Sequence, residues 1–430
     1  MTADAVVLLG AMFAARYPNL VPAATRRGLT VLGIDSPTPG HRRYDTARRE
    51  NAGHPLAGVA ELAWLAGDRH EEVLDQVIRW QRDHRVRAVV AVGEDFVEAA
   101  GVVTDYLGLP SPGLRASRVC RNKLLQRRYQ AEHGPVSWLL PPADRLARAQ
   151  EWTDFPAVVK PLRGEASSGV RRVVDRAELL ATLGEYDADE PVLLEQLVTG
   201  HEISVESLVQ GGEVRFASAT GKRTNERGGT YFVEMGHTAP DPGLAEPTRA
   251  AVLATNAAVL RRLAFADGIA HAEYRIGAGG RVYLMEVAAR AAGDSILTLY
   301  HLATGQPMEE ALLAIALGEP VSYPAPTRYA RQVYLEHQPG VLADVTVDGL
   351  DTAVTWLSQR WMWPAVTPRT DKLGTIHMIV AGRDRGAELG EIRQSSDRSV
   401  MYVIDAATPA ELDALEARCA KAITIEMRSG

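Results

Sequence analysis

The chain has 430 residues, of which 46% are hydrophobic and 23% are charged. This balance is typical of a globular protein and excludes intrinsic disorder as its main state. The net charge of −7 excludes a broad nucleic-acid-binding surface, which would be basic. At roughly 150 residues per domain, the length predicts more than one domain.

The cysteines and the N-terminal residues indicate the cellular compartment to expect. The two cysteines, Cys120 and Cys419, lie far apart and outside any C-x-x-C motif, which excludes a disulfide scaffold and a thiolate zinc site. Asp4 stands where a secretory signal would be basic, and no apolar run approaches the ~20 residues of a membrane span. We therefore expect a cytoplasmic protein that binds neither a membrane nor a nucleic acid.

The first 115 residues alternate between short apolar runs and segments with helical spacing. This β-α-β-α-β order predicts a doubly wound α/β domain. No G-x-G-x-x-G motif follows the first strand, so a dinucleotide fingerprint is missing. The predicted strands are residues 5–10, 29–34 and 88–92, and the predicted helices are residues 22–27 and 71–84.

After residue 150 the pattern changes to short strands with glycine-containing connections, which predicts antiparallel α+β structure. From residue 331 onward short strands dominate again, and we expect a third, smaller unit there. The predicted strands are residues 157–160, 170–174, 192–196, 202–209, 269–276, 281–288, 332–336, 375–381 and 400–404, and the predicted helices are residues 178–183, 248–264 and 410–422.

The hairpin of residues 269–288 is the most informative element of the sequence. With a turn at residues 277–280, the alternation of side chains makes Glu273 and Glu286 diagonal neighbours on one face, about 7–8 Å apart at the backbone. Two carboxylates this close repel each other unless a cation lies between them, and Mg²⁺ with a bound phosphate would serve. The alternative is an ordinary acidic sheet surface whose glutamates pair with arginines.

Taken together, these elements resemble the ATP-grasp superfamily over about residues 115–310. Lys123, at the start of a helix, and Lys160, in the sequence VVKP, are similar to the two phosphate-contacting lysines of that family. The small polar loop of residues 163–169 resembles its phosphate-covering loop, in which backbone N–H groups reach phosphate oxygens. The resemblance implies that Ser167, Ser168 and Gly169 contact the nucleotide.

The segment after the loop resembles the part of the family that reads adenine and ribose. Residues 195–198 are similar to the adenine hinge, in which backbone groups of Gln196 and Val198 read the purine edge. Glu202 ends the G-x-E motif of residues 200–202, seven residues after Glu195. It resembles the acceptor for the ribose hydroxyls. The implied nucleotide-binding residues are therefore Lys123, Lys160, Ser167, Ser168, Gly169, Glu195, Gln196, Val198 and Glu202.

Metal binding is implied by the same resemblance. Glu273 and Glu286 match the two metal carboxylates of the family, and Arg290 follows in an E-x-x-x-R motif. The implied cofactors are ATP and one or two Mg²⁺ ions, for which Mn²⁺ can substitute. Ala288 departs from the pattern, because many members have an asparagine there that binds the second ion. This departure leaves the number of metal ions open.

The resemblance also implies a fold of mixed α/β and α+β class in three parts. An N-terminal Rossmann-like pre-ATP-grasp domain is expected at residues 1–115, an ATP-grasp domain at residues 116–330, and a β-rich C-terminal α+β subdomain at residues 331–430. About residues 151–210 would form the small subdomain that clamps the nucleotide. Because many relatives pair through the outer α/β units, a homodimer is a family-level expectation.

Within the superfamily, residues 231–240 (YFVEMGHTAP) and 270–294 resemble the L-amino acid ligases that make dipeptides. In that group the loop histidine and the arginine lie near the reacting carboxylate and phosphate, which implies catalytic roles for His237 and Arg290. The alternative for His237 is a structural loop histidine. The implied substrate-binding residues are Glu234, His237, His271, Arg290, Gly293 and Asp294.

The expected activity is an ADP-forming carboxylate–amine ligase. It would activate an amino-acid carboxylate as an acyl phosphate and join it to an amine, giving a dipeptide or a γ-glutamyl-type amide. Amino acids are the expected small-molecule partners. Two alternatives remain: an ATP-grasp enzyme with another acceptor (a thiol, bicarbonate or a sugar amine), and a nucleotide-binding protein with degenerate chemistry, which Ala288 favours.

Overall fold

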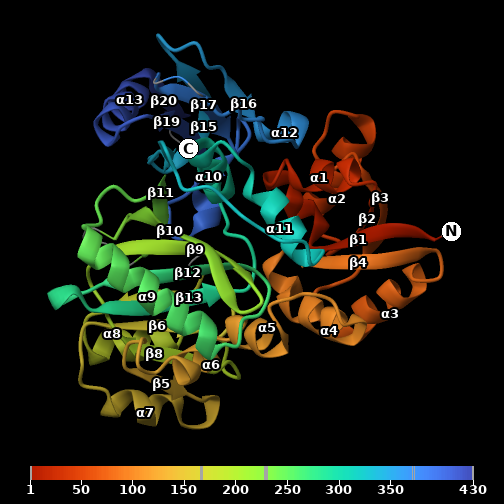
Figure 1. Cartoon of the computed structure of the whole chain (residues 1–430). Coiled ribbons are helices and arrows are strands. Elements are labelled where there is room, and N and C mark those ends of the chain that lie inside the picture. Colours follow the sequence, from red (N-terminus) through yellow and green to blue (C-terminus); the bar gives the residue numbers. More distant parts are fainter. Residues whose placement is uncertain (1, 165–167, 227–230, 370, 372, 429–430) are drawn as a thin grey trace.

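The computed structural model describes residues 2–164, 168–226, 231–369, 371 and 373–428. The predicted fold class is confirmed: the chain has the three-part ATP-grasp architecture (Figure 1). The N-terminal unit, red to orange in Figure 1, lies beside the central strands, and the C-terminal strands lie above them. None of the described helices is long and apolar enough to cross a membrane.

The N-terminal unit is built on a four-stranded sheet in the order β3-β2-β1-β4, with parallel pairing throughout. The sequence predicted three of these strands and missed β3, since only the first of its residues is fully buried and it has no apolar run. Its elements are β1 (Ala3–Leu9), α1 (Leu20–Arg26), β2 (Thr30–Asp35), α2 (Pro39–Glu50), β3 (Val59–Trp64), α3 (His70–Trp80), β4 (His84–Ala91) and α4 (Val97–Leu107), with a 3-10 helix at Ala11–Arg16 after β1.

A second four-stranded sheet, in the order β5-β8-β6-β7, is antiparallel and carries two helices on one apolar core. The predicted strand at residues 192–196 is observed as β8, whereas β5 was not predicted. The elements are α5 (Leu114–Cys120), α6 (Lys123–Tyr129), β5 (Ser137–Leu140), α7 (Arg145–Glu151), β6 (Ala157–Pro161), β7 (Arg171–Val173), α8 (Arg176–Leu183) and β8 (Val192–Gln196).

A nine-stranded sheet, in the order β13-β12-β9-β10-β11-β14-β19-β17-β16, continues from the central region into the C-terminal region. The predicted domain boundaries at residues 115 and 330 stay predictions. The central elements are β9 (His201–Gln210), β10 (Glu213–Thr224), β11 (Glu234–Ala239), α9 (Glu246–Arg262), β12 (Gly268–Ile276), β13 (Val282–Ala288), α10 (Ile296–Thr304) and α11 (Met308–Ala316).

The C-terminal region adds four strands to the large sheet and a separate three-stranded sheet in the order β18-β15-β20. The predicted closing helix of residues 410–422 is observed as α13, which packs on β19. The elements are β14 (Tyr329–Tyr334), β15 (Gly340–Val347), β16 (Val354–Trp356), α12 (Leu357–Arg360), β17 (Thr375–Ala381), β18 (Glu388–Leu389), β19 (Val400–Ala406), α13 (Pro409–Ala422) and β20 (Ile423–Arg428).

Gly200 joins the small sheet to β9 and allows a close backbone approach. Its φ is 137°, and a Cβ atom there would lie 2.0 Å from the carbonyl oxygen of Ile276. We expect Gly200→Ala to destabilise the protein by roughly 2–4 kcal/mol, because it adds a backbone clash to an unfavourable φ. Gly211→Ala is the matched control: its φ is 62° but the space beside it is open, so it should cost only about 1 kcal/mol. Equal urea midpoints for the two variants would contradict this account.

Candidate active site

A cavity of about 400 Å³ lies between the small sheet, the large sheet and the N-terminal unit. Nearly all of the predicted site residues line it. Gly169 is described but is not among the lining residues, and Ser167 lies outside the described residues. The predicted residues in the lining are Lys123, Lys160, Ser168, Glu195, Gln196, Val198, Glu202, Glu234, His237, His271, Glu273, Glu286, Arg290, Gly293 and Asp294.

The register predicted for the β12–β13 hairpin was wrong. Glu273 lies directly opposite Glu286 and not diagonal to it, because Ile276 pairs with Val282 and not with Arg281, and the register shifts once more between Glu273 and Tyr274. An extra residue of this kind is a β-bulge, and bulges re-aim side chains. Here Met285 and Glu286, although consecutive, both line the cavity. The bulge therefore brings the two carboxylates closer than strict alternation would.

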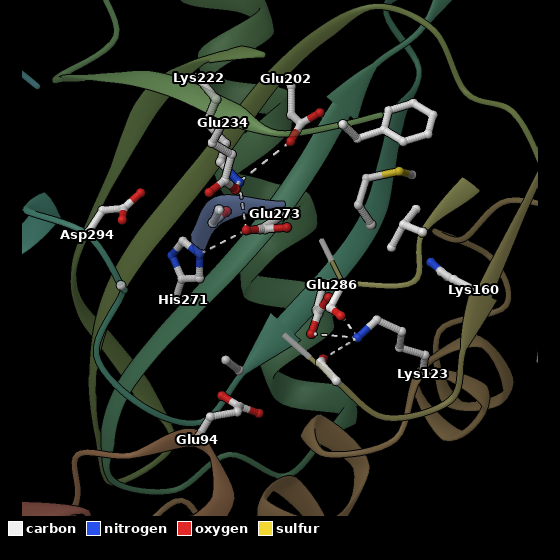
Figure 2. Close-up of a pocket in the computed structure, with 18 of the residues that line it drawn as sticks. Glu94, Lys123, Lys160, Glu202, Lys222, Glu234, His271, Glu273, Glu286 and Asp294 are labelled. Atoms are coloured by element: carbon white, nitrogen blue, oxygen red, sulfur yellow. Dashed lines mark hydrogen bonds and ion pairs between the residues drawn. The ribbon is translucent and has the colours of Figure 1, made fainter. Parts of the chain in front are cut away.

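Lys123 begins α6, where the Asn122 side chain caps the helix by accepting from the Leu125 N–H at 3.1 Å. The Lys123 ammonium lies 3.2 Å from the Glu286 carboxylate and donates to the Gly164 carbonyl at 2.9 Å. The predicted phosphate lysine thus bonds both the predicted metal ligand and the start of the predicted loop (Figure 2).

Lys160 on β6 lies 2.6 Å from the carboxylate of Glu195 on β8. Arg127 donates to the same carboxylate at 2.5 Å. Burial opposes the charge on Glu195, but the two cations outweigh it and hold the pKa of that carboxyl below its usual range. Glu195 was predicted as a nucleotide-binding residue, and its side chain pairs with Lys160 and Arg127.

Some backbone groups of the predicted adenine hinge, residues 195–198 at the end of β8, form hydrogen bonds within the protein. The Gln196 N–H donates to the Val136 carbonyl at 3.0 Å, and the Val198 carbonyl accepts from Arg275 at 2.9 Å. Arg275 also donates to Glu202 at 2.8 Å. One arginine therefore fixes both the hinge and the predicted ribose acceptor.

Lys222 on β10 lies at the centre of three carboxylates (Figure 2). Its ammonium lies 2.6 Å from Glu273 and 3.5 Å from Glu202, and it also pairs with Glu234. Burial opposes its charge, but the carboxylates raise the pKa of Lys222 well above its usual value. One oxygen from each of the three glutamates lies within 4.8 Å of the others. Such a set of oxygen donors fits a hard cation.

His271 on β12 is a buried imidazole between two carboxylates. Its Nδ1 lies 2.9 Å from Glu206 and its Nε2 lies 3.2 Å from Glu273. Burial opposes the charged form, but Glu206 and then Glu273 raise the pKa of His271 to about 10. Sequence reasoning missed Glu206. The signal was present, because Glu202 and Glu206 are four residues apart on one strand and share a face.

Arg290 follows β13, and Glu94 of the N-terminal unit holds its Nε. Arg121 donates to the other Glu94 oxygen at 2.6 Å. Burial opposes the charge on Glu94, but the two arginines lower the pKa of its carboxyl. Glu94 was missed by the sequence analysis, because nothing in a linear pattern links residue 94 to residue 290.

His237 on β11 is buried, and its Nε2 lies 2.9 Å from the Asp294 carboxylate. Asp294 also accepts from Arg398 at 2.8 Å and from the Tyr334 hydroxyl at 2.9 Å. Burial opposes its charge, but Arg398 and His237 hold the pKa of Asp294 well below its usual range. Arg398 and Tyr334 come from the C-terminal region and were not predicted.

Comparisons with known proteins identify the domain that carries most of this lining. The ATP-grasp domain family model matches residues 153–299, so this part of the chain is an ATP-grasp domain. The uncharacterized protein y4rH of Sinorhizobium fredii is 27% identical over 325 residues, and the match covers 70% of this chain and 66% of that protein. The chain thus spans just under two thirds of the length of this relative.

Solved structures agree with this family assignment. An L-amino acid ligase from Bacillus licheniformis has a TM-score of 0.76 and 21% identity, with 100% of both chains covered. The biotin carboxylase domain of a Hydrogenobacter thermophilus 2-oxoglutarate carboxylase, in complex with MgADP and bicarbonate, has a TM-score of 0.65 and 13% identity over 99% of this chain and 92% of that chain. The resemblance to ATP-grasp proteins, and to L-amino acid ligases in particular, is confirmed at the level of the fold.

The pKa of Lys160 generates a prediction. Burial lowers it to about 8, against the attraction of Glu195, so above pH 8 the lysine is mostly neutral before an anion binds. A bound diphosphate favours the charged form. We therefore expect Mg·ADP binding at pH 9 to take up protons through this group, and to take up almost none through it at pH 6.5.

Calorimetry in buffers that differ in ionisation enthalpy measures this uptake. Lys160→Gln removes the titrating group and should abolish the difference between the two pH values. The same uptake at pH 9 in the variant and in the wild type would contradict the assignment.

Proposed function

We propose that this chain is an ADP-forming carboxylate–amine ligase acting on amino acids, with a dipeptide or a γ-glutamyl-type amide as its product. The observation that carries the proposal is one cavity that combines two lysines, two opposed glutamates and an arginine, namely Lys123, Lys160, Glu273, Glu286 and Arg290. The fold shared with an L-amino acid ligase supports it.

The nucleotide would bind on the side of the small sheet. Lys123 and Lys160 would hold its phosphates, and Glu202 would accept from the ribose hydroxyls. Because the Gln196 N–H and the Val198 carbonyl are engaged within the protein, the Gln196 carbonyl and the Val198 N–H are the groups we assign to the purine edge. Met285, beside the bulge, lines the same cavity and offers an apolar surface to the base.

Glu273 and Glu286 would hold Mg²⁺, or Mn²⁺ in its place. Bound there, the ion supplies charge neutralisation and orientation of the phosphates. Ala288 also lines the cavity but has no ligand atom to offer, so a second ion would depend on Glu286, phosphate oxygens and water. We propose one or two ions on this basis.

The chemistry follows from charge. A carboxylate oxygen of the donor amino acid attacks the γ-phosphorus, and the bond to ADP breaks. Arg290 would stabilise the transferred phosphate and then the oxyanion, since its planar fork suits both. The acceptor amine attacks the acyl carbon, loses a proton and releases phosphate. His237, held by Asp294 at 2.9 Å, would lie at the reacting groups.

Three further expectations belong to the proposal. Free amino acids would be the partners of the site, the protein would act in the cytoplasm, and two copies would pair through their N-terminal units. Acceptors other than an amino acid are the main alternative, and a catalytically degenerate nucleotide-binding protein is the other, on the single observation of Ala288.

The test is product analysis with ATP, Mg²⁺ and pools of the twenty amino acids. ADP and phosphate that form only when amino acids are present would support the ligase, and deconvolution of the pools would identify donor and acceptor. AMP would contradict the acyl-phosphate route. ATP binding without turnover in any pool would favour the degenerate alternative.

Glu286→Gln tests the role of the opposed carboxylates. It keeps the shape of the side chain but removes a charged metal ligand, so ADP formation should fall roughly 1,000-fold or more while nucleotide binding persists. Glu213→Gln is the matched control, because Glu213 is exposed on β10 of the same sheet, and it should retain full activity. Activity in Glu286→Gln equal to that of the control would contradict the proposed site.

A further inference from the structure

The lysine and arginine side chains of the cavity differ in whether a carboxylate neutralises them. Among the described lining residues, each of these cations except Arg16 is paired with a carboxylate. The pairs are Lys123 with Glu286, Lys160 with Glu195, Lys222 with Glu273, Arg275 with Glu202, Arg290 with Glu94 and Arg398 with Asp294. Arg16 therefore offers the cavity a positive charge that the described protein groups do not neutralise.

An aromatic ring holds Arg16 without neutralising it. The guanidinium carbon of Arg16 lies 5.6 Å from the centroid of the Trp363 ring. A ring face attracts a guanidinium through its quadrupole and leaves the charge and the N–H groups available. Trp363 packs against the large apolar core of the molecule. The arginine is thus oriented by packing and is exposed to the cavity.

Arg16 lies at the reacting end of the cavity. The neighbouring Tyr17 donates its hydroxyl hydrogen to the Ala292 carbonyl at 2.6 Å, two residues after Arg290. Burial raises the pKa of Tyr17 against the charges of Arg290 and Arg16, and all three side chains line the cavity. The field of Arg16 also reaches Tyr334, whose hydroxyl bonds Asp294.

We propose that Arg16 binds the α-carboxylate of the amino acid that supplies the amine. The inference rests on the proposed function. An acceptor amino acid keeps its α-carboxylate through the reaction, and a carboxylate removed from water needs a cation partner. The free guanidinium fork matches it with two parallel hydrogen bonds. Acceptors that lack an α-carboxylate, such as a sugar amine or a thiol, would leave Arg16 without a partner.

The test compares the acceptor found in the pool screen with its α-amide, which keeps the amine and loses the negative charge. In the wild type, KM for the amide should exceed KM for the acid by roughly 10- to 100-fold, the range of one charge-assisted hydrogen-bond pair. Arg16→Gln should raise KM for the acid to that of the amide. KM for the amide and for ATP should not change, and Arg16→Lys should restore part of the preference.

Arg42→Gln is the matched control. Arg42 is also an exposed arginine stacked on a tryptophan of the same unit, with its guanidinium carbon 4.8 Å from the Trp64 ring centroid, but it does not line the cavity. It should keep the wild-type preference. An unchanged preference for the acid in Arg16→Gln, or an equal loss of acid and amide binding, would overturn the assignment.

A binding measurement separates this inference from the proposed function. If the wild type forms no amide, the ligase proposal fails, and thermal shifts then decide the role of Arg16. The probes are Mg·ADP with the pool of twenty amino acids or with the pool of their amides. A thermal shift that occurs with the amino acids but not with their amides, and that is lost in Arg16→Gln, supports the assignment. The same shift in both proteins, or none in either, overturns it.

Discussion

Charge neutralisation among buried side chains is the constraint on which the rest of this site depends. A carboxylate taken out of water costs several kcal/mol unless a cation and hydrogen bonds replace the lost solvation. Glu195, Glu273 and Glu286 each meet a lysine ammonium within about 3 Å. The lysines depend on the carboxylates in return, which is why Lys222 stays charged although its side chain is fully buried. Neither set of charges could be buried without the other.

The same pairing gives a physical reason for nucleotide and metal to bind together. In the proposed function, a phosphate would compete with Glu286 for Lys123, while a divalent cation would compete with Lys222 for Glu273. A phosphate alone would leave the Glu286 carboxylate without Lys123, which costs free energy, whereas Lys222 would still have Glu202 and Glu234. If both bind as proposed, Lys123 would exchange Glu286 for a phosphate, and Glu273 and Glu286 would exchange their lysines for the metal. Each charge of the site would then keep an opposite charge beside it.

The sequence predicted side chains well where local pattern determines them. Lys123 follows a capping asparagine at a helix start, and Lys160 ends an apolar strand, so the family resemblance could be recognised at both from short motifs. The predicted hairpin register was wrong because the turn is one residue longer than expected and because alternation has no place for the extra residue at Met285. Glu206 could have been found from its spacing to Glu202. Contacts between units could not be predicted, because Glu94 reaches Arg290 across 196 positions and Arg398 reaches Asp294 across 104.

This division between predictable and unpredictable residues has a functional meaning. The groups assigned to the nucleotide and the metal lie between Lys123 and Glu286, mostly inside the region that matches the ATP-grasp model. The remaining walls come from outside that region: Arg16 and Glu94 from the N-terminal unit, and Arg398 from the C-terminal strands. Function resides in sites that a fold supports and not in the fold itself. Because the proposed nucleotide and metal ligands all lie in the central walls, the outer walls can vary with the acceptor. The unpaired arginine in such a wall therefore indicates a negatively charged group on the proposed substrate, since the fold and the nucleotide site do not require it.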